Sequence, residues 1–311
     1  TDLLREVIIN MREGIEELGG EFYFSHKMED LKIKDGKVEE VVINSNRYKS
    51  GAYVLALGHS ARDSFEMLSD KISMENKNFA VGFRIEHKRE TINNAQYNGK
   101  NTDIEGSILP AASYNLSYND KKNGLSAYTF CMCPGGYVVN ASSEEGMTCV
   151  NGMSYHARNG ENSNSAIIAT VGEEIYGHKL LDGMRFQREV EKKAYQLGKG
   201  SVPVQRFIDY KNNRTSESYG SIKPSLESSY ELANLRGLYP KEIESTLIKA
   251  IDYMGNKING FDDEDAILSA AETRSSSPIR MLRDKENKAV HIDNLYVVGE
   301  GSGYSGGCLL Y

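Results

Sequence analysis

The sequence predicts an α/β plus α+β protein, in which an incomplete doubly wound, Rossmann-like domain with a β-meander carries an inserted, mainly antiparallel α+β domain. Two apolar runs, at residues 52–57 and 295–298, have the character of buried strands, and each ends in glycine. Between them the pattern changes to alternating strands and amphipathic helices. We therefore expect residues 1–70 and 286–311 to form one domain and residues 71–285 to form the inserted one.

The first domain is expected to begin with an amphipathic helix, because residues 3–18 place their apolar side chains on one helical face. Residues 22–25 are expected to form a short strand. Asp35-Gly36 lies between two apolar runs and predicts a β-hairpin, to which a third meander strand is added at residues 47–49.

The run at residues 52–57 is continuously apolar, which predicts a strand covered on both faces. It ends at Gly58 and His59, after which Ser60 and Asp63 have the spacing of a capping box that opens a helix. Unpaired N–H groups at such a helix start suit an anion or a polar ligand edge. A plain connection between strand and helix is the alternative interpretation.

The inserted domain is expected to be mainly antiparallel. Residues 79–86 alternate in a way that predicts one apolar face, with the other face small and then charged. Further strands are predicted at residues 125–133, 137–140 and 166–171. Three helices are predicted in the second half of this domain, at residues 186–198, 243–254 and 262–271.

Composition narrows the class of protein. The chain has 311 residues and a net charge of −7, without a basic stripe, which argues against nucleic acid as a partner. No apolar run approaches the roughly 18 residues of a membrane span, so no membrane partner is expected. Two of the four cysteines lie in Cys131-Met-Cys133, too close for an ordinary structural disulfide, and this favours a reducing, cytoplasmic setting.

The glycine-rich end of the chain contains the clearest ligand-binding signal. Gly301-Ser-Gly303-Tyr-Ser-Gly306 matches the dinucleotide fingerprint GxGxxG, directly after a predicted buried strand. No helix and second strand follow it in the sequence. The stretch is therefore either a second contact site for a dinucleotide bound mainly elsewhere, or a tail.

Three other features are candidates for chemistry. Cys131 and Cys133 are expected on one face of a strand, where they are either small packing residues or thiols facing a ligand. His59 lies between a strand-ending glycine and a helix start. None of the six histidines has a second ligand at metal-binding spacing, so no metal site is expected.

Charged residues at the end of the inserted domain form the third candidate. Glu272, Arg274 and Arg280 either hold an anionic substrate group or form a surface ion-pair cluster. No nucleophile elbow and no Walker A loop occur in the sequence.

Six ordered motifs extend through essentially the whole chain: residues 56–63 (ALGHSARD), 77–87 (KNFAVGFRIEH), 130–136 (FCMCPGG), 151–155 (NGMSY), 272–278 (ETRSSSP) and 299–307 (GEGSGYSGG). Together they resemble the bacterial FAD-dependent dehydrogenases, most of them uncharacterised. The resemblance implies a glutathione-reductase-type FAD fold with an inserted domain. In that family a strand–GxGxxG–helix segment binds the ADP part of FAD, and this sequence has no such segment.

The resemblance also implies residue roles. Gly58, with its neighbours His59 and Ser60, matches the strand end near the cofactor. Gly299 and Glu300 match the segment that contacts the ribityl and pyrophosphate region. The stretch below the flavin ring would contain Gly301, Gly303, Tyr304, Gly306 and Gly307. Cys131, Cys133 and Arg274 are then candidates for the substrate side, as catalytic residues.

We therefore expect an FAD-dependent oxidoreductase that transfers a hydride between a small-molecule substrate and the flavin. The chain is expected to be a piece of a longer protein that is inactive alone, binds FAD weakly or not at all, and forms a homodimer. The alternative function is a non-catalytic ligand-binding module, for example for carbohydrate, built on Tyr- and Asn-rich antiparallel strands.

Overall fold

Contacts between residues divide the chain into two units, each described by itself. The computed structural model describes residues 2–99, 109–122 and 124–305. One unit, called here the seven-stranded unit, comprises residues 80–171 and 186–275. The other, called here the terminal unit, comprises residues 2–79, 172–185 and the chain from residue 276 on. The predicted mixture of helices and strands is confirmed, whereas the Rossmann-like and inserted character of the two parts stays a prediction.

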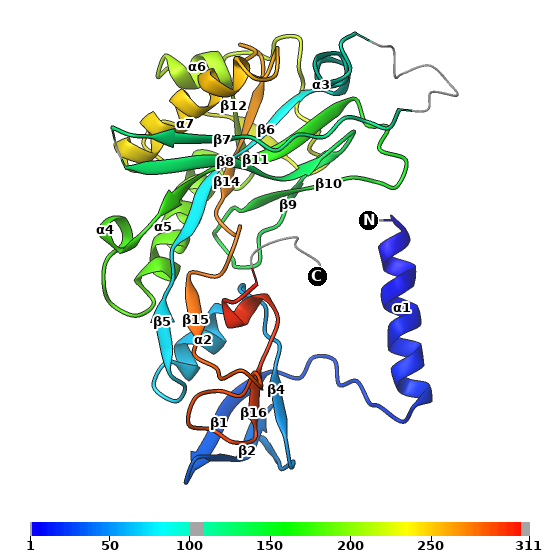
Figure 1. Ribbon diagram of the computed structural model, residues 1–311, viewed down its shortest axis with the longest axis vertical. Helices are drawn as coiled ribbons and strands as arrows, with labels where there is room; N and C mark the ends of the chain where they lie inside the picture. Colours follow the sequence, from blue (N-terminus) through cyan, green and yellow to red (C-terminus); the bar gives the residue numbers. More distant parts are fainter. Residues whose placement is uncertain (1, 100–108, 123, 306–311) are drawn as a thin grey trace. The chain divides into compact units, whose positions relative to one another are not determined.

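The terminal unit contains three small sheets (Figure 1). Its sheets have the strand orders β1-β2-β3, β15-β5 and β16-β4. Its elements are α1 (Asp2–Glu17), β1 (Met28–Lys34), β2 (Lys37–Ile43), β3 (Asn46–Tyr48), β4 (Tyr53–Leu55), α2 (Arg62–Leu68), β5 (Met74–Asn76), α4 (Glu173–Tyr176), β15 (Ile279–Met281), β16 (Leu295–Val297) and the 3-10 helix η1 (Glu300–Ser302).

The predicted β-meander is confirmed. β1 pairs antiparallel with β2, and β2 with β3. Asp35 and Gly36 both have positive φ, at 50° and 73°, as a two-residue hairpin turn of the primed type requires. Leu31 and Val38 face inward from the hairpin and are 2% and 3% exposed, so one face of the meander joins the core of this unit.

The two glycine-ended strands, expected in one domain, are neighbours in one sheet. β4 and β16 pair in parallel, with Leu295 opposite Tyr53 and Val297 opposite Leu55. Leu295 and Val297 are completely buried. Val54, however, is 63% exposed, so the expectation that this strand is covered on both faces is wrong. Within the described residues this sheet has two strands.

Two local predictions in the terminal unit are wrong. Residues 22–25 form turn and coil instead of a strand, and Phe22 and Phe24 stack on each other with ring centroids 6.3 Å apart. The helix start is also displaced, because α2 begins at Arg62 with Ala61, not Ser60, as its N-cap. The predicted first helix is confirmed as α1, whose apolar face is exposed: Ile8 is 58% and Met11 63% exposed.

The seven-stranded unit is built on one mixed sheet with the strand order β13-β12-β14-β6-β11-β8-β7 and a separate β10-β9 pair. β12 and β13 are parallel, while β12–β14, β14–β6, β11–β8 and β8–β7 are antiparallel. Its elements are β6 (Phe79–Lys88), α3 (Arg89–Gln96), β7 (Ser117–Asp120), β8 (Leu125–Cys133), β9 (Tyr137–Asn140), β10 (Val150–Met153), β11 (Asn162–Val171), α5 (Asp182–Leu197), β12 (Val202–Arg206), α6 (Phe207–Lys211), β13 (Tyr230–Leu232), α7 (Lys241–Gly255) and β14 (Ile267–Glu272).

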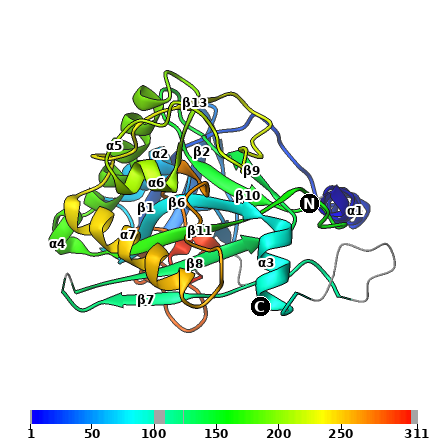
Figure 2. The same cartoon turned by 90° about the horizontal axis from the view of Figure 1, so that it is seen from above.

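The centre of the large sheet is covered on both faces. α7 lies along β7, β8 and β11 (Figures 1 and 2) and buries Ile243, Leu247 and Ile251. β6 is buried from its first residue to His87, so its predicted small-then-charged face is buried as well, with Arg84 and Glu86 both 0% exposed. The strand lies between β14 and β11, and both faces of such a middle strand are packed.

The helix predicted at residues 262–271 is wrong. Residues 262–266 form turns, and β14 follows as a fully buried strand between β12 and β6. The acids that suggested a first helical turn, Asp262, Asp263 and Asp265, belong to the loop before the strand. Asp263 Oδ1 accepts a hydrogen bond from the Asp265 N–H at 2.8 Å, a local contact that favours a turn.

No helix among the described residues combines the length and the apolar character that a membrane span requires.

Candidate functional site

Two glycine loops leave the parallel β4–β16 pair at the same edge. Because parallel strands end on the same side of a sheet, the loop after β4 and the loop after β16 lie together. Gly58 has φ of 66°, and Gly299 has φ of 70° with ψ of −169°. The Gly299 conformation is accessible essentially to glycine alone. The sequence-predicted glycines therefore adopt backbone shapes that other residues disfavour.

The two loops approach each other main chain to main chain. A Cβ added at Gly301 would lie 2.6 Å from the Gly58 carbonyl oxygen. A Cβ added at Gly303 would lie 2.3 Å from the Ile279 carbonyl oxygen, and its φ is 83°. At Gly58 and Gly299, in contrast, an added Cβ would meet no heavy atom within 4 Å. Gly301 thus joins the two loops, Gly303 packs the second loop on β15, and Gly58 and Gly299 leave bare main chain beside open space.

A side-chain contact also joins the loops. His59 Nδ1 lies 3.0 Å from Glu300 Oε1, and the His59 side chain is 7% exposed. Neither ring nitrogen has a hydrogen-bond partner of good geometry among the described residues. Ser302 Oγ donates a hydrogen bond to the Gly299 carbonyl at 2.7 Å, which fixes the start of η1. A buried imidazole nitrogen with an unmet hydrogen bond fits a site that takes a polar ligand.

Basic side chains surround the last described turn of the second loop. The guanidinium carbons of Arg283 and Arg280 lie 4.3 and 5.1 Å from the centre of the Tyr304 ring. Burial and the neighbouring Arg280 lower the pKa of Lys77, and the carboxylate of Glu300 opposes this shift. Positive charge therefore gathers beside the glycine loops, as a phosphate-bearing ligand requires.

Sequence reasoning did not find this basic cluster. Lys77 follows β5, whereas Arg280 lies in β15, two segments about 200 residues apart that meet only through the antiparallel pairing of those strands. Of the predicted cofactor residues, Ser60 is exposed and its carbonyl accepts the Arg62 N–H at 2.9 Å. Gly306 and Gly307 lie outside the described residues.

The predicted catalytic residues lie in the seven-stranded unit. Cys131 and Cys133 are half-buried thiols at the end of β8. Arg274 is 8% exposed at its side chain and forms an ion pair with the fully buried Glu191, with Nη2 2.8 Å from Oε2. A catalytic role of these three residues stays a prediction.

The predicted charged cluster is divided among separate partners. Arg280 Nη1 lies 2.8 Å from Glu75 Oε1, on the surface of the terminal unit. Glu272 Oε1 lies 3.5 Å from Arg84 Nη1, and both side chains are almost completely buried. The interpretation as one surface ion-pair cluster is therefore wrong. Within the described ranges, no three His, Cys, Asp or Glu side chains are grouped as metal ligands.

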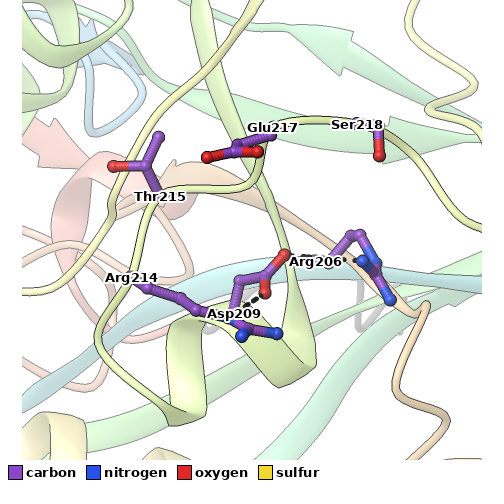
Figure 3. Close-up of a pocket in the computed structure, with 6 residues that line it drawn as sticks. All are labelled: Arg206, Asp209, Arg214, Thr215, Glu217 and Ser218. Atoms are coloured by element: carbon purple, nitrogen blue, oxygen red, sulfur yellow. Dashed lines mark hydrogen bonds and ion pairs between the residues drawn. The ribbon is translucent and has the colours of Figure 1, made fainter.

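A separate polar pocket of about 420 Å³ lies in the seven-stranded unit (Figure 3). Its arginines already have carboxylate partners: Arg214 Nε lies 2.6 Å from Asp209 Oδ1, and Arg206 Nη2 lies 2.6 Å from Asp265 Oδ1. The pocket is lined by Arg206, Asp209, Arg214, Thr215, Glu217 and Ser218. These ion pairs hold the loop after α6 in place.

The tyrosines between residues 87 and 160 do not form an exposed aromatic platform. Of the described ones, Tyr155 is 36% exposed, and the others are buried or half-buried. Tyr114 is 8% exposed and its hydroxyl donates to Ser165 Oγ at 3.0 Å. Sugar-binding surfaces use accessible aromatic rings, so this stretch lacks the feature that would favour a carbohydrate-binding module.

The fold and the two loops define a mixed α/β protein with a main-chain cradle suited to a phosphate-bearing cofactor. The family model described as "FAD-dependent protein, C-terminal domain-like" matches residues 78–275, more than half of the chain. The chain therefore belongs to this FAD-dependent family, and the expectation of FAD as the cofactor is confirmed at the level of the family.

Two further similarities complete the comparison. An uncharacterized protein of Clostridium beijerinckii is 44% identical over 313 residues, which cover 99% of this chain and 58% of that protein. The chain thus spans little more than half the length of this relative. The crystal structure of CtdE in complex with FAD aligns with 94% of this chain and 51% of that chain, at 7% identity and a TM-score of 0.30. That likeness is too weak to indicate a shared fold.

Proposed function

We propose that this chain is part of an FAD-dependent oxidoreductase that transfers a hydride between a small-molecule substrate and the flavin. The observation that carries the proposal is the pair of glycine loops at the ends of the parallel strands β4 and β16. These loops combine bare main chain at Gly58 and Gly299 with an adjacent basic cluster. Membership in an FAD-dependent family supports the same assignment.

The residues of the glycine loops fit a flavin nucleotide in three respects. Gly58 and Gly299 have open space where any other residue would carry a side chain. The buried Nε2 of His59 has an unmet hydrogen bond within the described residues. Lys77 supplies positive charge for phosphate groups, and Arg280 lies beside it but also pairs with Glu75 at 2.8 Å. These residues would hold the cofactor, and FAD when bound supplies the hydride chemistry.

In this proposal the chain itself binds and orients the flavin cofactor. The contact between Gly301 and Gly58 fixes the spacing of the two loops, so a ligand meets a preformed surface. The His59–Glu300 contact links the same loops through their side chains. Because Glu300 places negative charge beside Lys77 and Arg280, it also limits how strongly this cluster attracts anions.

A titration of FAD into the purified chain, followed by fluorescence polarisation, tests the proposal. We expect weak, saturable binding that Gly301→Ala reduces at least about tenfold, or about 1.4 kcal/mol. Gly51→Ala is the matched control, because an added Cβ there meets no heavy atom within 4 Å. The same protein extended to the full length of its relatives should show the visible flavin absorption band. A colourless extended protein without affinity for FAD would overturn the proposal.

A homodimer is the partner that we propose for the chain itself, and light scattering measures it directly. A monomeric mass at micromolar concentration would contradict the proposed homodimer.

A further inference from the structure

Arg84 is a buried cation at the centre of the seven-stranded unit. It lies in β6 and is 0% exposed. Its Nη2 donates to the Cys133 Sγ at 3.1 Å and to the Cys131 carbonyl at 2.6 Å, while Nε donates to Asn164 Oδ1 at 2.7 Å. A guanidinium with three fixed hydrogen bonds cannot swing away from the thiol as a surface arginine would.

The surrounding backbone is shaped for this contact. Gly152 leaves the space that Arg84 occupies, because an added Cβ would lie 2.1 Å from Nη2. β8 carries an irregular register between the pairs Asn164–Cys133 and Ala166–Phe130, and Cys131 has a φ of 43°. This β-bulge turns the Cys131 carbonyl and the Cys133 thiol toward the same guanidinium.

The charges around Arg84 favour a negative partner at Cys133. Burial alone would lower the pKa of Arg84, but Glu272 and the two neighbouring cysteines raise it above its ordinary value. The guanidinium is therefore charged at neutral pH. Glu272 Oε1 lies 3.5 Å from Nη1 and competes for the same cation. A neighbouring guanidinium favours the thiolate form of a cysteine, which is its nucleophilic form.

Accessibility separates Cys133 from the deeply buried Cys149. Cys131 and Cys133 are half-buried. Cys149 is 1% exposed, and burial raises its pKa to about 11. Among these three cysteines, Cys133 alone combines partial exposure with a described guanidinium contact to its sulfur.

We propose that Cys133 is a nucleophilic thiolate, positioned by Arg84, whose substrates are disulfides of small molecules. Its sulfur attacks one sulfur of the disulfide and forms a mixed disulfide, and the other half leaves as a thiolate. Cys133 is oxidised and the substrate disulfide is reduced by the same electron pair, so no further oxidant takes part. The reaction needs no flavin and does not rest on the proposed function.

The rates of modification of the individual cysteines test this proposal on the unaltered chain. The probe is 2-hydroxyethyl disulfide, and fragment-ion mass spectrometry distinguishes adducts at Cys131 from those at Cys133. At about pH 6.5 we expect Cys133 to react at least about tenfold faster than Cys131. The ratio should shrink at about pH 9.5, where an ordinary accessible thiol is also ionised. Equal rates at both pH values would overturn the proposal.

Two variants of opposite expected effect separate a charge role from a packing role. Gly152→Ala displaces the Arg84 guanidinium and should slow Cys133 at about pH 6.5 about tenfold while leaving the rate at about pH 9.5 unchanged. Glu272→Gln removes the competing carboxylate and should accelerate Cys133 at the lower pH. Effects of the same sign in both variants, or effects that do not depend on pH, contradict the assignment. The comparison of cysteines in the unaltered chain decides the question if either variant does not fold.

Discussion

Replacing Gly301 by alanine tests whether the two glycine loops are held together by direct main-chain contact. The added methyl group would lie 2.6 Å from the Gly58 oxygen and 3.0 Å from its nitrogen. Both atoms belong to the backbone, so no side-chain rotation relieves the overlap, and either β4 or β16 has to shift. Overpacking of this kind costs about 1–3 kcal/mol. We therefore expect Gly301→Ala to lower the free energy of unfolding of the terminal unit by about 2 kcal/mol.

Two matched variants separate steric overlap from backbone strain as the cause of the lost stability. At Gly299 an added Cβ has open space, so Gly299→Ala measures backbone strain alone, about 1–3 kcal/mol. Gly51→Ala meets nothing and has no positive φ, so its effect should stay within about 0.5 kcal/mol. Urea unfolding is followed by circular dichroism, since the chain has no tryptophan. Hydrogen exchange of peptides from β4 and β16 assigns the change to this unit. If the Gly301→Ala protein has the same free energy of unfolding as the Gly51→Ala protein, the close approach of Gly301 to the Gly58 backbone is refuted.

Two further predictions concern buried charge in the seven-stranded unit. Burial lowers the pKa of His87 to about 4 from 6.5, so the folded state binds fewer protons, and stability should fall as pH decreases from about 6.5 to about 4, by up to about 1.4 kcal/mol per pH unit. His87→Gln should flatten this slope in urea midpoints measured across that range, and an unchanged slope would exclude His87 as its source. Glu191→Gln leaves Arg274 buried without its counter-charge and should cost about 3–5 kcal/mol, whereas Asp252→Asn breaks an exposed pair and should cost less than about 1 kcal/mol. Thermal denaturation compares the two, and equal losses contradict the assignment of burial as the cause.

The sequence predicted features whose signal is local. The Asp35-Gly36 turn forms because both residues accept positive φ, and no distant contact is needed to choose it. The pairing of β4 with β16 is long-range, yet it was predictable, because both strands share an apolar run that ends in glycine. The glycine half of the candidate site follows from this shared pattern of the two strands.

The wrong predictions of secondary structure have a common cause, which is tertiary packing. Residues 262–271 carry acids followed by Ile267, Leu268 and alanines, a pattern that a helix start and a loop before a strand share. These residues form a strand because β14 pairs with β12 on one side and β6 on the other. The periodicity of the sequence does not predict this pairing. The expected strand at residues 22–25 fails for the converse reason, since no described segment pairs with it. Arg84 was not among the predicted site residues, because its hydrogen bonds to Cys131, Cys133 and Asn164 join stretches that lie far apart in the sequence.

The buried cations distinguish the seven-stranded unit from an ordinary sheet core. Arg84 and Arg274 both lie beside β14, each with a buried carboxylate partner, Glu272 for the first and Glu191 for the second. Ion pairs in such a place recover little more than their desolvation cost, and apolar residues of similar size would stabilise the fold at least as well. Stability alone therefore does not account for these residues. Arg274 makes close, two-pronged contact with its carboxylate, whereas Arg84 Nη1 lies 3.5 Å from Glu272 Oε1 and its Nη2 donates to the Cys133 Sγ at 3.1 Å. A buried cation polarises whatever lies next to it, and here that neighbour is the Cys133 sulfur.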